Sequence, residues 1–142
     1  MRRHQPQPSV GVLKLYYGLP CPYCRKAMTK RGNGKHSATR DHIVPKSKGA
    51  WDIGVRNVIV ACKNCNCDKD SKTLAEFYIW LHRSSDPRAQ IVYEFMQRIC
   101  QTVPTIAAHK LIGFPVDKPC FVNDTERQRR LHSDAVTVTG AD

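Results

Sequence analysis

Residues 57–69 read NVIVACKNCNCDK, and the CxxC pair at Cys62 and Cys65 in this stretch repeats an earlier pair, CPYC, at Cys21 and Cys24. Two residues between cysteines let both thiolates bind the same metal ion, and two such pairs complete a tetrahedral zinc site. Four thiolates leave no open position for a substrate, so we expect this zinc to be structural. A redox-active pair and a coincidence of spacing are the alternatives, but the sequence shows no βαβ pattern of the kind that accompanies a redox pair.

The segments around the cysteines predict short strands followed by helices. Residues 39–44 and 57–61 have strand patterns, and the loop between them is too long for a tight hairpin turn. A short helix is expected to begin within residues 62–65 and to run to about residue 69. The capping box Thr73-Leu74-Ala75-Glu76 predicts a second helix, and Asp86-Pro87 predicts the start of a third.

The positive charge of the chain is concentrated in its first half. The formal net charge is +11 at pH 7 over 142 residues. Residues 1–72 hold fifteen lysines and arginines against four acidic residues, whereas residues 73–142 hold eight of each sign. A chain this basic is expected to contact a polyanion, either a nucleic acid or an acidic membrane surface. Its longest apolar run, Val58 to Cys62, is far below the roughly 20 residues that span a bilayer.

Four polar residues lie between and beside the cysteine pairs, namely Asp41, His42, Asn57 and Asn66. An Asp-His dipeptide alone is more often an ordinary surface pair than a catalytic one. Here, however, the pair ends a predicted strand, and Asn66 directly follows Cys65, where a zinc ion would fix the start of a helix. The zinc site can therefore hold a polar side chain of that helix rigidly against the Asp-His pair.

Taken in order, the segments CPYC, DHIVPKSKGA and NVIVACKNCNCDK resemble the HNH endonucleases of the ββα-metal fold, over roughly residues 21–82. In that family the His of the Asp-His pair is the general base, which implies this role for His42. The preceding Asp41 is implied as a ligand of the catalytic divalent metal, and Asn57 as the residue that braces the loop between the strands. The residue after the second CxxC is the other metal ligand. Many members have His there, so Asn66 implies an H-N-N variant that suits Mg²⁺.

The resemblance implies an endonuclease that hydrolyses DNA phosphodiester bonds by a one-metal mechanism with a His general base. Its cofactors would be one structural Zn²⁺ and a catalytic Mg²⁺ or Mn²⁺, and its products would carry 5′-phosphate and 3′-hydroxyl ends. The alternative is a zinc-stabilised nucleic-acid-binding module without catalytic activity, which explains the cysteines and the charge but not the Asp-His pair. A RING-like protein-interaction module would need two interleaved zinc sites, and the sequence offers no second set of ligands.

These features predict an α+β protein with a small ββα-metal (HNH) core and a four-cysteine zinc knuckle, followed by additional α-helices. We expect an N-terminal arm at residues 1–17, in which residues 10–17 form a short strand or simply lead to the first cysteine pair. The nuclease domain is expected at residues 18–83, a helical extension at 84–122, and a polar, flexible tail at 123–142.

The expected partner is DNA, most simply double-stranded DNA, and not a membrane. A homodimer is compatible with the sequence but not indicated by it. No apolar signal segment follows the basic residues after Met1, so we expect a cytoplasmic protein, encoded by a bacterium or a phage. Basic side chains bind backbone phosphates without reading base sequence. The residues expected to make such contacts are Arg40, Lys46, Lys48, Lys63, Lys69 and Lys72.

Overall fold

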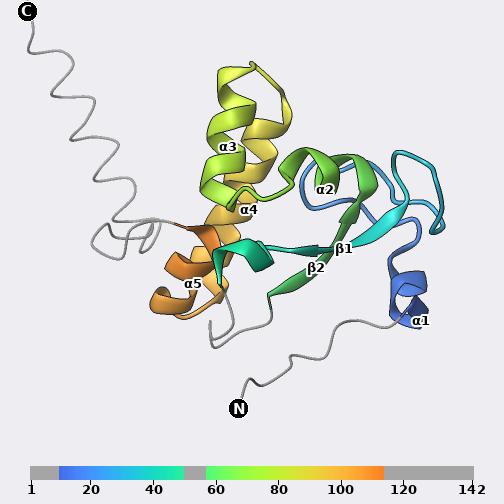
Figure 1. Ribbon diagram of the computed structural model, residues 1–142, viewed down its shortest axis with the longest axis horizontal. Coiled ribbons are helices and arrows are strands. Elements are labelled where there is room, and N and C mark those ends of the chain that lie inside the picture. The colour runs from blue at the N-terminus through green and yellow to red at the C-terminus, as the bar shows by residue number, and fades with distance from the viewer. Residues whose placement is uncertain (1–9, 50–56, 114–142) are drawn as a thin grey trace, which may run out of the picture.

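The computed structural model describes residues 10–49 and 57–113 (Figure 1). This part consists of a two-stranded antiparallel sheet, a short helix packed beside it, and further helices. Its elements in chain order are α1 (Val10–Leu13), η1 (Lys14–Tyr16), β1 (Ala38–His42), η2 (Lys46–Lys48), β2 (Val58–Cys62), α2 (Lys63–Lys69), α3 (Leu74–Arg83), α4 (Arg88–Thr102) and α5 (Thr105–Ile112). The expected fold class, α+β with a small two-stranded sheet, a four-cysteine cluster and additional helices, is confirmed.

The sheet and α2 form a ββα unit. β1 and β2 pair antiparallel, with Asp41 opposite Ile59 and His42 opposite Val58. The Asp-His pair therefore ends β1, just before the chain turns toward η2. β2 ends at Cys62, and α2 begins at the next residue and packs against both strands. This arrangement brings the second cysteine pair, at the junction of β2 and α2, beside the strand that carries the Asp-His pair.

The helices α3 and α4 pack side by side and supply most of the remaining core (Figure 1). Thr73 caps α3, because its Oγ1 accepts the backbone N–H of Glu76 at 3.2 Å, as the capping box predicts. Before α4, the Asp86 carboxylate accepts the backbone N–H of Arg88 at 2.9 Å. The buried apolar side chains of the two helices include Leu74, Phe77, Leu81, Val92, Met96 and Ile99.

Residues 10–16 form one helical turn, α1, and the 3₁₀ turn η1, where one of the two sequence interpretations predicts a short strand. The backbone of this segment bonds locally, since the N–H of Tyr17 donates to the carbonyl of Lys14 at 3.4 Å. Leu13 is buried, whereas Leu15 is exposed. The segment thus leads into the loop that carries Cys21 and Cys24, called here the cysteine loop, and is not part of the sheet.

Candidate active site

The four paired cysteines, Cys21, Cys24, Cys62 and Cys65, form one group, called here the cysteine cluster. Their sulfur atoms all lie within 4.8 Å of one another, and Cys24 Sγ is 3.8 Å from Cys62 Sγ. A tetrahedron with zinc–sulfur bonds of about 2.3 Å has edges of about 3.8 Å, so the cluster fits a zinc ion. Three of the four side chains are buried and Cys24 is half-buried. The four cysteines are therefore positioned to hold a metal such as zinc in a closed site.

Hydrogen-bond donors surround the cysteine cluster. The backbone N–H groups of Cys62 and Tyr23 donate to Cys21 Sγ, at 3.3 and 3.5 Å. The guanidinium of Arg88, at the start of α4, donates to Cys65 Sγ at 3.6 Å. Side-chain hydrogen bonds from Cys62 and Cys65 lower the pKa of the Cys21 thiol, and the hydrogen bonds with Cys21 raise the pKa of the Cys62 and Cys65 thiols. The donors from the backbone and from Arg88 favour the thiolate form that a metal ion requires.

Among the described residues, two further cysteines, Cys67 and Cys100, lie outside the cluster. Cys67 is an exposed free thiol on α2, only two residues after Cys65, and does not join the four sulfur atoms. Cys100 on α4 packs half-buried against the core. Neither residue takes part in the geometry of the candidate site.

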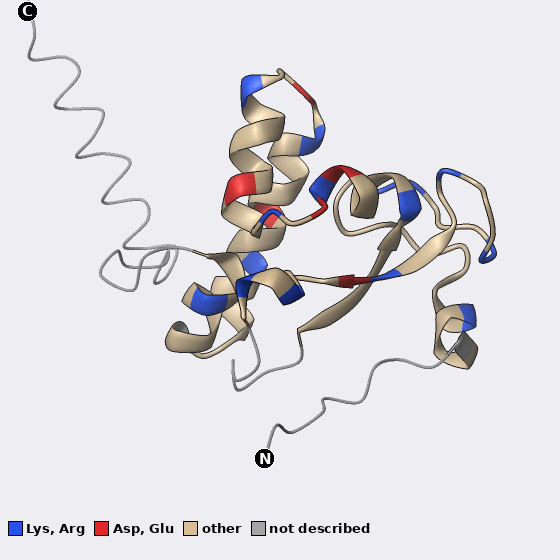
Figure 2. Cartoon of the chain, viewed as in Figure 1, with Lys and Arg blue, Asp and Glu red and all other residues tan. Residues whose placement is uncertain are grey.

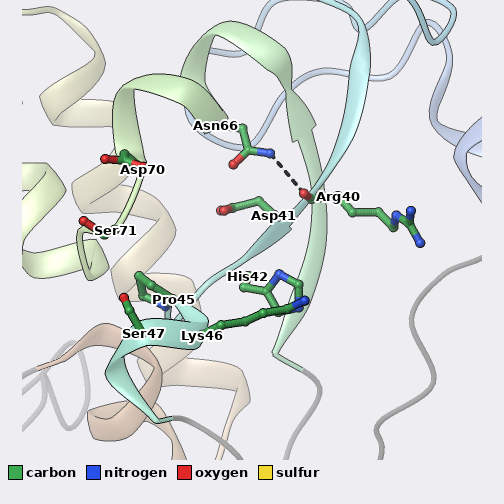
Figure 3. A pocket seen from close by; sticks show the side chains of 9 residues that line it. All are labelled: Arg40, Asp41, His42, Pro45, Lys46, Ser47, Asn66, Asp70 and Ser71. Carbon is green, nitrogen blue, oxygen red and sulfur yellow. Dashed lines mark hydrogen bonds between the residues drawn. The ribbon is translucent and has the colours of Figure 1, made fainter.

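A pocket of about 280 Å³ opens between the end of β1, η2 and the C-terminal end of α2 (Figure 3). Asp41 and His42 from β1 and Asn66 from α2 all line it. Three of the four residues to which the family resemblance gives a role are thus brought together by the ββα unit. Asp70 and Ser71, which the sequence analysis does not single out, line the pocket where α2 ends.

Asp41 is only 3% exposed, and both of its carboxylate oxygens accept hydrogen bonds. The hydroxyl of Tyr23 donates to Oδ2 at 2.6 Å, and the ammonium of Lys69 lies 3.3 Å from Oδ1. The same ammonium donates to the backbone carbonyl of His42 at 2.8 Å. Burial raises the pKa of Asp41, and the charge of Lys69 opposes that rise. Burial also raises the pKa of Tyr23, so its hydroxyl stays protonated and able to donate.

Asn66 is oriented by two hydrogen bonds from its amide nitrogen, one to the carbonyl of Arg40 at 3.0 Å and one to Thr39 Oγ1 at 3.1 Å. Because an amide carries its nitrogen and oxygen on opposite sides, these bonds direct Oδ1 away from the strand backbone. Figure 3 shows that oxygen and the Asp41 carboxylate pointing to the same side of β1. Two oxygen donors from different elements suit a hard divalent cation such as Mg²⁺. The chemistry of the donor set therefore fits the cation that the family resemblance implies.

His42 lies on the η2 side of the pocket, half-exposed, and Figure 3 shows the side chain of Lys46 beside its ring. Burial and the nearby charge of Lys46 lower the pKa of His42. A lowered pKa keeps the imidazole neutral at pH 7, which is the form that can accept a proton.

Asn57 lies outside the pocket and is only 6% exposed. Its Oδ1 accepts the N–H of Val44 at 2.8 Å, and its Nδ2 donates to the carbonyl of the same residue at 2.9 Å. The backbone carbonyl of Asn57 also accepts the N–H of Ile43 at 3.0 Å. These bonds fix the two residues that follow His42, so Asn57 determines where the chain leaves β1.

The ββα unit, the loop between its strands and the preceding segment with Cys21 and Cys24 together form the cysteine cluster and the pocket. Residues 21–72 match the HNH endonuclease family. The resemblance to this family is therefore confirmed for residues 21–72, called here the HNH region. The HNH region lies within the domain expected at residues 18–83, and the bounds of that domain stay a prediction. No curated protein is significantly similar to the chain. Within residues 10–49 and 57–113, no helix has the length and apolarity needed to cross a membrane.

The sequence predicts Lys69 of the HNH region as a DNA contact, and this prediction is wrong, because the side chain is buried. The side chain of Lys69 is 0% exposed, and its ammonium is held by Asp41 and the His42 carbonyl. A side chain enclosed in this way cannot reach a DNA backbone. Asn66 and Lys69 are three residues apart on α2 and therefore share one helical face, the face toward β1. That spacing is the signal from which the buried position of Lys69 could have been inferred.

The other five basic residues of the predicted set remain at the surface to different degrees. Arg40 and Lys46 are exposed and line the pocket. Lys48 is exposed but pairs with Glu76 at 3.2 Å, and Lys72 lies 4.9 Å from the ring centroid of Trp80. Lys63 of α2 is half-buried. Figure 2 shows basic positions along β1, η2 and the loop before β1, around the HNH region.

Proposed function

We propose that the protein is an HNH-type endonuclease that hydrolyses DNA phosphodiester bonds with one divalent cation and with His42 as general base. The observation that carries this proposal is the pocket at which Asp41 and Asn66, from two different elements, meet His42. The match of residues 21–72 to the HNH endonuclease family supports it. The cysteine cluster contributes by fixing the start of α2, which carries Asn66 one residue after Cys65.

Each residue of the pocket has a stated task in this proposal. Asp41 and Asn66 hold the cation through a carboxylate oxygen and an amide oxygen. When bound, such a cation supplies Lewis-acid stabilisation of the negative charge that develops on the phosphate. Neutral His42 accepts a proton from a water molecule in line with the bond to be broken and then releases it to solvent. We expect products with 5′-phosphate and 3′-hydroxyl ends.

We take double-stranded DNA as the simplest substrate, and the excess of positive charge in residues 1–72 supports a nucleic acid as the partner. Arg40 and Lys46 line the pocket and are exposed, which supports a role for both in binding phosphates next to the cleaved bond. Lys48, Lys63 and Lys72 extend the basic surface beyond the pocket. Such contacts supply affinity without base recognition, so they imply no particular cleavage sequence.

A zinc-stabilised nucleic-acid-binding module without catalytic activity is the second candidate. One observation favours it, since the ammonium of Lys69 already neutralises the carboxylate of Asp41. A carboxylate oxygen has two lone pairs, however, and can accept a hydrogen bond while it also binds a cation. The two candidates therefore differ in whether DNA is cut, which an experiment can decide directly.

The test is cleavage of supercoiled plasmid by the zinc-loaded protein with Mg²⁺ or Mn²⁺. We expect nicking or cutting that falls by about 10²–10⁴-fold in His42→Ala, because a positioned general base contributes that much to rate. Zinc content is expected to stay unchanged. His82→Ala is the matched control, because His82 is exposed on α3 and lies outside the pocket. Plasmid left intact by the folded, zinc-loaded wild type with either cation, or cut equally fast by His42→Ala, would overturn the proposal.

A further inference from the structure

Tyr23 lies between two members of the cysteine cluster, within Cys21-Pro22-Tyr23-Cys24, yet its hydroxyl contacts the candidate active site. Its side chain is 0% exposed. The hydroxyl donates to Asp41 Oδ2 at 2.6 Å across 18 residues of sequence. One side chain thus connects the loop that supplies half of the cluster with the carboxylate that we assign to the cation.

The ring of Tyr23 is held from several sides, so its hydroxyl has a fixed direction. It packs edge-on against Phe77 of α3 and Phe95 of α4, each with ring centroids 5.7 Å away. The backbone N–H of Tyr23 also donates to Cys21 Sγ at 3.5 Å. A metal ion bound by that sulfur would hold the same backbone in place. The direction of the hydroxyl therefore depends on the cysteine cluster and on the two helices together.

The other oxygen of Asp41 faces Lys69, so each carboxylate oxygen has its own donor. A planar carboxylate held at both oxygens cannot rotate about its bond to Cβ without losing one hydrogen bond. Each oxygen keeps a further lone pair with which to bind a cation. Partners of this kind orient the groups that bind a metal, and their removal typically lowers metal affinity by about 10–100-fold.

We propose that Tyr23 is a positioning residue of the candidate cation site, which fixes the carboxylate of Asp41 and thereby couples cation affinity to the cysteine cluster. The inference rests on the proposed function, because it requires that Asp41 and Asn66 bind a divalent cation. It goes beyond that function by giving the cysteine loop a task at the pocket. Tyr23 itself touches neither the cation nor the substrate.

The test is a titration of zinc-loaded Tyr23→Phe with Mn²⁺. The electron paramagnetic resonance signal of free Mn²⁺ measures how much of the cation remains unbound. This substitution keeps the ring and removes the hydroxyl. We expect the dissociation constant for Mn²⁺ to rise by about 10–100-fold, with zinc content unchanged. We also expect plasmid cleavage by Tyr23→Phe to recover at saturating Mn²⁺, which a merely structural defect would not allow. Tyr78→Phe is the control, because Tyr78 lies on α3 away from the pocket and should bind Mn²⁺ as the wild type does.

Asp41→Asn separates the failure of this inference from the failure of the proposed function. If the wild type binds no Mn²⁺, or if Asp41→Asn binds it as tightly as the wild type, the cation site is refuted and the role of Tyr23 with it. If Asp41→Asn loses binding but Tyr23→Phe matches the wild type, only the inference is overturned.

A second measurement covers the case in which Tyr23→Phe does not retain zinc. Site-specific 3-fluorotyrosine at position 23 keeps the hydroxyl and reports on its surroundings by ¹⁹F nuclear magnetic resonance. We expect its resonance to shift during a Mg²⁺ titration and to saturate together with cation binding. A resonance that does not respond while the cation binds would overturn the role of Tyr23.

Discussion

Asp41 and Lys69 form an ion pair from which water is almost excluded, with side-chain exposures of 4% and 0%. Such a pair is costly to form, because both charges lose their hydration. The Tyr23 hydroxyl and the His42 carbonyl offset part of that cost, since each gives one of the two charged groups a further hydrogen bond. The pair is therefore better explained by the fixed position that it gives Asp41 than by a net gain in stability.

Lys69→Met tests this interpretation, because it removes the ammonium but keeps most of the side-chain volume. The carboxylate of Asp41 is then left buried without its counter-charge. We expect the free energy of unfolding of the zinc-loaded protein to fall by about 3–5 kcal/mol. Chemical denaturation followed by circular dichroism measures this change.

The matched control for Lys69→Met is Lys63→Met, also on α2, where the ammonium has no such buried partner among the ion pairs of the described residues. The double variant Asp41→Asn/Lys69→Met should recover part of the lost stability, because it leaves no charge buried. A loss in Lys69→Met no larger than that in Lys63→Met would contradict the buried ion pair.

The helix α4 lies outside the HNH region, yet it contacts the cysteine cluster, which the sequence does not predict. Its first residue, Arg88, donates to Cys65 Sγ at 3.6 Å and to Asp68 at 2.8 Å, both on α2. The same guanidinium pairs with Asp86 at 2.8 Å. Arg88 therefore joins the start of α4 to α2, the helix that supplies both Cys65 and Asn66.

Arg88→Ala should weaken zinc binding, because it removes a charged donor to the Cys65 thiolate. It also removes the contact of α4 with Asp68 on α2. We expect zinc to be transferred to a colorimetric chelator about 10–100-fold faster than from the wild type. Arg83→Ala is the control, since Arg83 is exposed at the end of α3. Equal transfer rates from Arg88→Ala and Arg83→Ala would show that α4 does not support the cluster.

The elements that could be predicted from the sequence are those determined by local chemistry. Residues 39–44 have the strand pattern of β1, observed at Ala38–His42, and the Thr73 side chain caps α3 as its capping box predicts. Local patterns also predict the cysteine cluster, because the two residues between the cysteines of each CxxC pair are visible in the sequence. The helical turn at residues 10–16 is not predicted, since its short apolar pattern fits either a strand or a loop.

The candidate site was predictable only as a set of residues and not as a set of contacts. Family resemblance brings Asp41, His42 and Asn66 together, and the structure places all three at one pocket. The contacts of Tyr23 and Lys69 with Asp41 span 18 and 28 residues of sequence. No local pattern indicates which side chains meet across such distances, because that depends on how α2, β1 and the cysteine loop pack.

At the scale of the whole molecule, the positive charge and the candidate site occupy the same half of the chain. All of the formal excess of +11 lies in residues 1–72, which contain the HNH region, while residues 73–142 are neutral. The neutral half supplies the helices that pack behind the cysteine loop. A polyanion is therefore expected to bind on the side of β1 and η2 and not on the side of α3 and α4.

This distribution predicts a steep dependence of DNA binding on salt. If the five accessible basic residues each neutralise one phosphate, affinity should fall roughly 500-fold between 50 and 200 mM salt. Fluorescence anisotropy with His42→Ala and no divalent cation measures binding without cleavage. Lys46→Gln should reduce the slope of log affinity against log salt by about 0.9, whereas Lys110→Gln on α5 should leave it unchanged. A flat response to salt would rule out the assigned phosphate contacts.

The two halves of the cysteine cluster are separated in sequence by residues 25–61, a segment that contains β1 and most of β2. Joining them closes a loop whose chain entropy opposes folding by an amount on the order of 4 kcal/mol. A chain emerging from the ribosome holds Asp41 and His42 well before it holds Cys62 and Cys65. Until the second pair has been synthesised and the loop has closed, Asn66 is not held beside Asp41 and the pocket is not formed, so the nascent chain has no assembled site during most of its synthesis.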